Sequence, residues 1–231
     1  MKILGVIPAR SGSKAIKLKN IKLFNNKPLI YWTIKSAKKS IINKLIVSTD
    51  SKKIKKISEY YGCEVPFLRP KNISGDKTKG IDVIKHALNF YEKKKIDKFD
   101  AVMTLQPTCP FRITEDINKA IHIMKTKRAD SVISLVDVEG FHPSRMKYIV
   151  KGKIKNPPFA KNDNIPRQKL KKTYLRSGLI YLAKTKLIKK NILLNNKTYP
   201  IITPVNRSFN IDTQLDFDIA EIYMKNNLKK K

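Results

Sequence analysis

Four stretches of the sequence combine cationic and hydrogen-bonding side chains in patterns that suit the binding of anionic ligands. The first stretch, residues 9–14, is extended by Lys19 and Asn20. Its small hydroxyl residues and Gly12 let backbone N–H groups approach phosphate oxygens, and its basic side chains supply positive charge. The order of its residues differs from that of a P-loop and of a dinucleotide fingerprint. Taken alone, the stretch fits a phosphate-binding loop and a flexible basic surface loop equally well.

The second stretch, residues 105–112, contains prolines on both sides of Thr108. Because proline fixes the backbone, Gln106 and Thr108 are expected to present hydrogen-bonding groups in rigid positions. Arg112 is expected to present a planar fork to a carboxylate or a phosphate. A stiff connector with Gln106 at its mouth is the alternative interpretation.

The third stretch places Arg167 beside Gln168, with Arg176 and the Ser-Gly pair at 177–178 following along the chain. An arginine and an amide together can grip a carboxylate or an N-acyl group. The alternative is that these residues lie on the rim of a projecting segment and bind nothing.

The fourth stretch, residues 208–213, is followed by Asp216. Alternation along a short predicted strand places Asn210 and Asp212 on one face, where their oxygens suit Mg²⁺ beside phosphates. Thr213 and Asp216 also fit the pattern that begins a helix, so Asp212 could instead mark a helix entrance.

The elements that must position these stretches form an α/β pattern, in which apolar strand-like runs alternate with amphipathic helical stretches. This alternation predicts a mostly parallel sheet with helices on both faces. We expect strands over residues 3–8, 44–49, 63–68, 101–105, 131–136 and 179–183. We expect helices from about residue 28, over 51–61 and 78–95, from residue 114, and over 215–224. Ligands of such sheets bind at the carboxyl ends of the strands, where loops follow.

The chain is expected to form one domain over residues 1–231, with an insertion over about 140–176. In that insertion the periodicity fades and four prolines interrupt it, as in an inserted hairpin or arm. No apolar run approaches the roughly 20 residues that cross a bilayer, and the N-terminus lacks a signal-peptide pattern. Only Cys63 and Cys109 are present. These features predict a cytoplasmic protein with reduced cysteines and no membrane association.

Fifty Lys and Arg against eighteen Asp and Glu give a net charge of +32. Such a charge attracts nucleic acid and other polyanions, so a basic nucleic-acid-binding module is one alternative from a different functional class. The lysines, however, are dispersed at helical spacing around apolar positions, which is typical of solvated helix faces. We therefore expect no specific nucleic-acid partner.

Taken in order, the four stretches resemble one family, the acylneuraminate cytidylyltransferases, which includes the CMP-sialic, legionaminic and pseudaminic acid synthetases. The resemblance covers nearly the whole chain. It is carried by IPARSGSK with LKN, IVSTD, LRP, LQPTCPFR, His142-Pro143, Pro166-Arg167-Gln168, SGLIY at 177–181 and Asn210-Ile211-Asp212-Thr213.

The resemblance implies a three-layer αβα fold of the nucleotide-diphospho-sugar transferase type, with an inserted dimerisation arm. It implies Mg²⁺-dependent transfer of CMP from CTP to the anomeric hydroxyl of a nonulosonic (sialic-type) acid, with release of pyrophosphate. The family's arm crosses a two-fold axis, so the resemblance also implies a homodimer in which Arg167 serves the partner's site. The 3-deoxy-manno-octulosonate cytidylyltransferases share the first-loop pattern and a late Asp, and they remain the second enzymatic reading.

The resemblance also implies a role for each matching residue. The residues expected to bind the nucleotide are Arg10, Ser11, Gly12, Ser13, Lys14, Asn20, Arg69, Asp76 and Gly80. The residues expected to orient the sugar acid are Gln106, Thr108, Arg167, Gln168 and Tyr181. Catalysis is assigned to Arg10, Lys19 and Asp212, and the Mg²⁺ ligands are Asp212 and Asn210. Asn210 stands where the family frequently has Asp, which removes one negative ligand.

Overall fold

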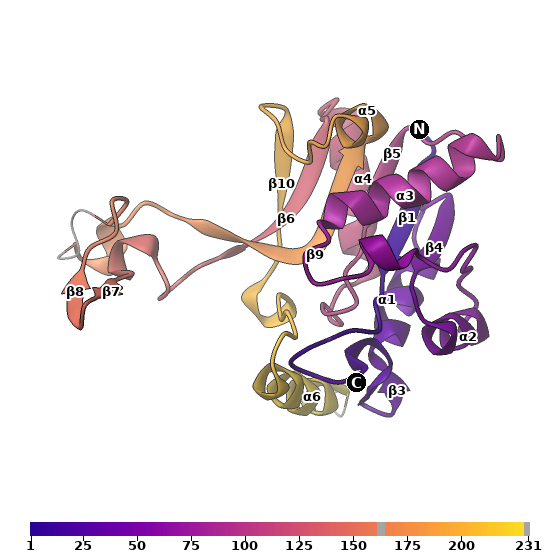
Figure 1. The fold of residues 1–231 in the computed structure, drawn as a ribbon. Coiled ribbons are helices and arrows are strands. Elements are labelled where there is room, and N and C mark those ends of the chain that lie inside the picture. The colour runs from indigo at the N-terminus through magenta and orange to yellow at the C-terminus, as the bar shows by residue number, and fades with distance from the viewer. Residues whose placement is uncertain (161–164, 229–231) are drawn as a thin grey trace.

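The structure, a computed structural model, describes residues 1–160 and 165–228, with only the backbone of Arg167 and Leu228. Its centre is a six-stranded sheet of order β10-β6-β9-β5-β1-β4 (Figure 1). The strands are β1 Ile3–Pro8, β4 Lys44–Ser48, β5 Ala101–Thr104, β6 Ser131–Asp137, β9 Tyr174–Lys184 and β10 Thr198–Ile202. β9 runs antiparallel to both of its neighbours, and the remaining pairs are parallel.

Helices cover both faces of this sheet. On one face α1 (Leu29–Lys38), α2 (Lys52–Tyr60) and α4 (Thr114–Thr126) bury their apolar sides against the strands. On the other face α3 (Gly80–Lys93) and the short α5 (Thr185–Lys189) do the same. The predicted αβα arrangement and mostly parallel sheet are therefore confirmed. None of the helices within the described ranges is both long and apolar enough to cross a membrane.

The C-terminal helix α6 (Gln214–Leu228) packs against a separate small hairpin of β2 (Leu23–Phe24) and β3 (Lys27–Pro28). Residues 25 and 26, both Asn, adopt positive φ of 49° and 62°, which suits the tight two-residue turn of the hairpin. The ring of Phe24 is fully buried and meets Phe217 of α6 edge-on, with centroids 5.4 Å apart. This packing holds α6, together with the preceding residues 208–213, against residues 16–29.

Three sequence-based predictions of strands need correction. Residues 63–68 form only two isolated bridges, to Ile46 of β4 and to Thr49 just after it, because continuing the parallel ladder would require an N–H at position 66, which is Pro66. β10 was not among the predicted strands; it contains Pro200, which a strand at the sheet edge tolerates. Residues 208–213 run as irregular chain rather than as a strand.

A long arm, of which the structure describes residues 138–160 and 165–173, projects from the body between β6 and β9 (Figure 1). It carries η3 (Pro143–Arg145), the hairpin β7 (Tyr148–Val150) with β8 (Lys153–Lys155), and η4 (Arg167–Lys169). The remaining 3-10 turns are η1 Lys19–Ile21, η2 Lys71–Ile73 and η5 Val205–Arg207.

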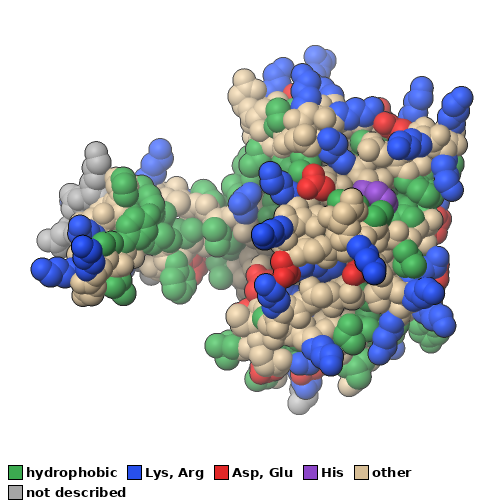
Figure 2. All heavy atoms as spheres, in the orientation of Figure 1, with side chains coloured by type: hydrophobic (Ala, Val, Ile, Leu, Met, Phe, Trp, Pro, Cys, Tyr) green, Lys and Arg blue, Asp and Glu red, His purple; other side chains and the backbone are tan. Residues whose placement is uncertain are grey.

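The arm and the body differ in their surfaces. Figure 2 shows hydrophobic side chains gathered on the arm, and Lys and Arg side chains scattered over the visible face of the body. Phe141, Ile149 and Ile154 of the arm are exposed by 84%, 80% and 74%. Apolar side chains this exposed mark a surface that a partner could cover.

Candidate active site

A cavity of about 320 Å³ opens at the carboxyl ends of β1 and β5. It brings together the first, second and fourth stretches, which are far apart in the sequence. Its lining residues are Pro8, Arg10, Ser13, Lys19, Asn20, Gln106, Pro107, Thr108, Asn210 and Asp212. The cavity therefore contains two of the three cations of the first stretch, Arg10 and Lys19, together with polar groups of the second and the acid of the fourth.

The first loop, residues 9–20, is held in place by two carboxylates, that of Asp50 after β4 and that of Asp76 between η2 and α3. Ser11 donates both its backbone N–H and its hydroxyl to Asp50, at 2.8 and 2.7 Å. Arg10 Nη1 donates to Asp76 Oδ1 at 2.6 Å, and Lys14 Nζ lies 2.9 Å from Asp76 Oδ2. Ser11 is thus engaged with a protein acid, whereas Gly12 faces open space, since a Cβ there would meet no atom within 4 Å.

The end of the first loop contacts the fourth stretch directly. Lys19 Nζ donates to the carbonyl oxygen of Ile211 at 2.7 Å and lies 3.3 Å from Asp212 Oδ1. Asn20 Nδ2 donates to the carbonyl oxygen of Arg10 at 2.9 Å, which closes the loop on itself. The side chain of Lys19 is 12% exposed and that of Asp212 is 64% exposed. A nearly buried cation therefore faces an accessible carboxylate across the cavity.

The fourth stretch supports both interpretations made from its sequence. Thr213 and Asp216 form a reciprocal pair that begins α6: Thr213 N donates to Asp216 Oδ2 at 2.7 Å, and Asp216 N donates to Thr213 Oγ1 at 3.2 Å. Asp212 precedes this pair, and its own carboxylate lines the cavity. The backbone N–H of Ile211 donates to Thr108 O at 2.9 Å, which joins the fourth stretch to the second.

Arg112 of the second loop, residues 105–112, does not present its guanidinium to a ligand, contrary to the sequence-based expectation. It is 3% exposed. Its Nε donates to Leu179 O at 2.7 Å, Nη1 to Thr33 Oγ1 at 3.0 Å and Nη2 to Gln106 O at 2.7 Å. Burial lowers the pKa of Arg112 to about 10, so it stays protonated at neutral pH. Arg112 therefore fixes the loop from beneath.

Gly178 supports the side chain of Gln106 from the other side. Its φ of +77° is in the left-handed region, at an irregularity in the pairing of β9 with β6. A Cβ at this position would lie 2.8 Å from Gln106 Oε1 and 3.2 Å from Cys109 Sγ. Burial raises the pKa of the Cys109 thiol, which lies 3.7 Å from Asn210 Oδ1. Only glycine leaves room for Gln106 in its observed position.

Arg69 is a buried cation whose hydrogen-bonding capacity is not satisfied by the described residues. It is 5% exposed, and its Nε and Nη2 have no partner there. Burial lowers its pKa, while the nearby charge of Asp50 opposes that shift. Buried donors are nearly always paired in proteins, so this guanidinium needs an acceptor that a ligand could supply.

The remaining predicted residues lie outside the cavity lining. Gly80 is the first residue of α3 and has open space around it. Tyr181 lies in β9 opposite Thr104, where burial raises its pKa. Gln168 is exposed on the arm, and the side chain of Arg167 is outside the described part of the structure.

Asp212 offers the cavity one accessible carboxylate, a group that can ligate a divalent cation. Within the residues that the structure describes, no cluster of three His, Cys, Asp or Glu side chains forms a ready-made metal cage. Mg²⁺ commonly uses only one or two carboxylates, together with substrate phosphates and waters. The accessible carboxylate of Asp212 meets that need. Asn210 turns its Nδ2 toward Asp212 Oδ2, at 2.5 Å, and its oxygen toward Cys109.

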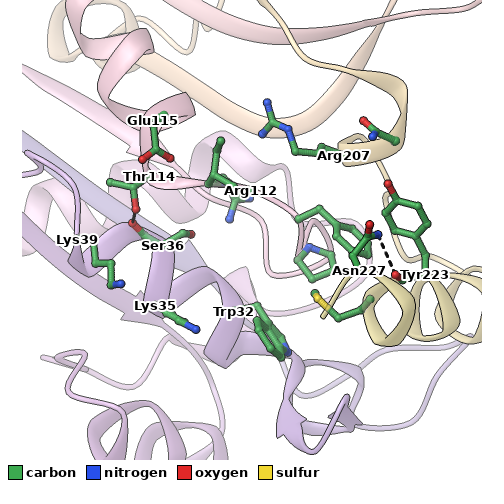
Figure 3. Close-up of a pocket in the computed structure, with 15 residues that line it drawn as sticks. Trp32, Lys35, Ser36, Lys39, Arg112, Thr114, Glu115, Arg207, Tyr223 and Asn227 are labelled. Atoms are coloured by element: carbon green, nitrogen blue, oxygen red, sulfur yellow. Dashed lines mark hydrogen bonds between the residues drawn. The ribbon is translucent and has the colours of Figure 1, made fainter. Parts of the chain in front are cut away.

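A larger hollow, about 570 Å³, lies between α1, the start of α4 and α6 (Figure 3). Trp32, Lys35 and Tyr223 are among its lining residues. None of the sequence-predicted site residues apart from Arg112 lines it, and its Arg207 is already paired with Asp116. Although this hollow is larger, the candidate active site is therefore the cavity that Arg10, Lys19 and Asp212 line.

Sequence reasoning missed the supporting roles of Asp50, Arg112 and Gly178. Asp50 was recognisable as the acid that ends the second predicted strand, at the same sheet edge as the first loop. The role of Arg112 depends on its burial, and that of Gly178 on the close approach of β9 to Gln106. No local sequence pattern signals either feature.

The fold and the cavity together define a nucleotidyltransferase-like α/β protein, with cations and an acid gathered at the carboxyl edge of the sheet. Among solved structures, CMP:2-keto-3-deoxy-manno-octonic acid synthetase complexed with CTP shares this fold. Its TM-score is 0.71 at 16% identity, and the match covers 98% of this chain and 100% of that one. At that identity the likeness concerns the fold alone.

The chain belongs to the cytidylyltransferase family, whose model matches residues 4–228. It is 34% identical to the CMP-N,N'-diacetyllegionaminic acid synthase of Legionella pneumophila, over 98% of each chain. It is 32% identical to the post-translational flagellin modification protein B of Campylobacter coli, over 99% of this chain and 98% of that protein. The N-acylneuraminate cytidylyltransferase of Escherichia coli is 40% identical over 54% of this chain and 29% of that protein. The family predicted from the sequence motifs is confirmed.

Proposed function

We propose that residues 1–231 act as one nucleotidyltransferase domain that transfers CMP from CTP to a nonulosonic acid. The observation that carries this proposal is the convergence of Arg10, Lys19, Gln106 and Asp212 on one cavity, in a chain of this family. Full-length relatives named as legionaminic and pseudaminic acid enzymes support a nonulosonic acid as acceptor. Because cells hold CTP in the cytoplasm, we place the reaction there.

In the proposed reaction, the anomeric hydroxyl oxygen of the sugar acid attacks the α-phosphorus of CTP. A new oxygen–phosphorus bond forms, the bond to the bridging oxygen breaks, and pyrophosphate leaves with that electron pair. Phosphoryl-type transfer is catalysed mainly by positioning and by neutralising charge. Arg10 and Lys19 supply that charge from the cavity wall, with Ser13 and Asn20 as further donors.

Recognition of the cytidine is assigned to Arg69, because its buried Nε and Nη2 need acceptors. Gly12 and Lys14 of the first loop and Gly80 at the start of α3 are also assigned to the nucleotide. A Cβ at Gly12 or at Gly80 would meet no atom within 4 Å, so both positions leave room for a ligand.

Mg²⁺, when bound, would neutralise phosphate charge and polarise the reacting phosphoryl group. Asp212 is the residue proposed to hold it, with Asn210 as a neutral neighbour. For that, Lys19 must give up its 3.3 Å contact to the carboxylate and turn to the nucleotide. Asp212 is also proposed to accept the proton of the attacking hydroxyl.

The sugar acid is assigned to the side of the cavity formed by Gln106 and Thr108, with Tyr181 behind it in β9. The arm is proposed to reach a second copy of the chain, so that Arg167 and Gln168 complete the partner's site. The exposed apolar residues of the arm support this homodimer, because water-exposed Ile149 and Ile154 would then be covered.

A turnover assay with CTP and Mg²⁺ tests the proposed function. The acceptor panel contains N-acetylneuraminic, N,N'-diacetyllegionaminic, pseudaminic and 3-deoxy-manno-octulosonic acids, and pyrophosphate release is the readout. We expect turnover with at least one nonulosonic acid and its loss on chelation of Mg²⁺. Turnover with the octulosonate alone would favour the second enzymatic reading, and no turnover with any acceptor would reject both.

A further inference from the structure

Asp76 binds two cations of the first loop with its two carboxylate oxygens. Arg10 Nη1 lies 2.6 Å from Oδ1, and Lys14 Nζ lies 2.9 Å from Oδ2. Asp76 belongs to the loop between η2 and α3, so the contact joins segments 66 residues apart. Two oxygens of one anion, each held by a cation, form the arrangement that a phosphate group would adopt in the same place.

This contact is accessible and easily broken. The side chains of Arg10, Lys14 and Asp76 are 36%, 82% and 44% exposed. Exposed ion pairs contribute little to folding and are screened by salt. Lys14 and then Arg10 lower the pKa of Asp76 through their hydrogen bonds, so its carboxylate is ionised at neutral pH. A polyanion with more charge than one carboxylate can therefore displace it.

The other acids near the first loop behave differently. Asp50 accepts hydrogen bonds from the neutral hydroxyl and the backbone N–H of Ser11. Because Asp50 holds no cation of the first loop in these contacts, they can persist when a phosphate binds. Asp212 also contacts a cation, Lys19, but it lines the cavity and is itself proposed to hold the metal, whereas Asp76 does not line the cavity. Asp76 thus differs from both acids, because it binds two cations of the first loop at once, one of them the Arg10 assigned to the phosphates.

We propose that Asp76 is an internal competitor of the triphosphate, which holds Arg10 and Lys14 in the free protein and releases them when the nucleotide binds. This inference rests on the proposed function. A carboxylate repels a triphosphate, so Asp76 acts on nucleotide affinity through the two cations rather than by binding the ligand. Its effect must depend on the phosphates and be absent for cytidine, which has none.

The test compares Asp76→Asn with the wild-type protein by calorimetric titration with CTP and with cytidine at low ionic strength. Asn keeps the size of the side chain and removes its charge. We expect the dissociation constant for CTP to fall about three- to tenfold, in line with the loss of exposed ion pairs, and that for cytidine to stay unchanged. The gain should shrink as salt is added.

Asp97→Asn is the matched control. Asp97 pairs with Lys2 at the opposite end of the sheet, so this variant changes the net charge equally and leaves the first loop intact. Weaker CTP binding by Asp76→Asn, or a change no larger than that of Asp97→Asn, would overturn the inference. A parallel change for cytidine would also overturn it. Failure of the wild-type protein to bind CTP would instead reject the proposed function.

Discussion

The first loop and the second loop meet at the same cavity, but the protein holds them in opposite ways. In the first loop, Arg10 and Lys14 are held by the accessible carboxylate of Asp76, and the largely buried Lys19 contacts the exposed carboxylate of Asp212. The second loop is fixed by the buried guanidinium of Arg112, each nitrogen of which donates to a protein acceptor. Exposed ion pairs exchange partners at small cost, whereas buried hydrogen bonds do not.

This difference separates two tasks within one site. Under the proposed function, the first loop accepts a highly charged substrate, and its cations are held by carboxylates that a phosphate group can replace. The second loop would then keep Gln106 and Thr108 in fixed positions, and it is anchored below the surface by Arg112. Mutations in the two loops should therefore differ in whether they change the rate or the stability.

The largest effect is expected from Asp212→Asn, which removes the carboxylate proposed for the metal. We expect kcat/KM to fall by about 10³-fold, equivalent to roughly 4 kcal/mol of transition-state stabilisation. Because Asp212 is 64% exposed, the free energy of unfolding should stay unchanged. Steady-state pyrophosphate release and urea denaturation measure the two quantities. Asp218→Asn on α6 is the control, and a variant that kept most of its rate would reduce Asp212 to a residue at the helix entrance.

The next largest effect is expected from a pair of variants that compares the two loops directly, Arg112→Met in the second loop and Arg10→Met in the first. Arg112→Met leaves Gln106 O, Leu179 O and Thr33 Oγ1 without their donor, so the free energy of unfolding should fall by roughly 3 kcal/mol. Arg10→Met should lose turnover while its urea midpoint stays at the wild-type value. Equal losses of stability in both variants would show that the loops are held alike, and Arg112→Lys provides a milder variant if the first does not fold.

A smaller effect is expected from Gly178→Ala. Gly178 and Gly152 have similar positive φ of +77° and +72°, but only at Gly178 would a Cβ meet Gln106. Strain should cost both alanine variants about 1–2 kcal/mol of stability. Only Gly178→Ala should also raise KM for the sugar acid, because Gln106 must shift. Kinetics with both substrates test this, and an unchanged KM for the sugar acid would remove Gln106 from acceptor binding.

The smallest effect is expected from thiol reagents. Burial raises the pKa of Cys63 to about 12 and raises that of Cys109 as well, so neither is a reactive thiolate at neutral pH. We expect no thiol to titrate with Ellman's reagent in the native protein, and both to titrate after denaturation. Rapid labelling of Cys109 in the native state would show that the second loop opens, contrary to its buried anchoring.

The sequence predicted the sheet, its helices and the convergence of the loops because these follow from apolar periodicity and from the rule that loops meet at one sheet edge. The sequence-based prediction failed where the pairing of a strand depends on which strands lie beside it in the sheet. Pro66 breaks a ladder that needs its N–H, whereas Pro200 is tolerated in an edge strand. The same residue type therefore had opposite consequences that no local window distinguishes.

Within the site, the sequence located residues better than it assigned their tasks. Arg10, Lys19, Gln106 and Asp212 were each recognisable as polar residues after a strand or before a helix. Arg112 had the same appearance, yet it is buried and each of its guanidinium nitrogens donates to a protein acceptor. Whether an arginine faces a ligand or the protein interior depends on tertiary packing, which a one-dimensional pattern does not contain.

The continuity of β9 has a mechanical consequence. This strand runs unbroken from Tyr174 at the root of the arm, past Gly178, to Lys184 in the middle of the sheet. The arm is therefore anchored in the sheet through a strand that passes beside Gln106 at Gly178. In the homodimer proposed above, a force on the arm would therefore act along β9 on Gly178, the residue against which the side chain of Gln106 lies.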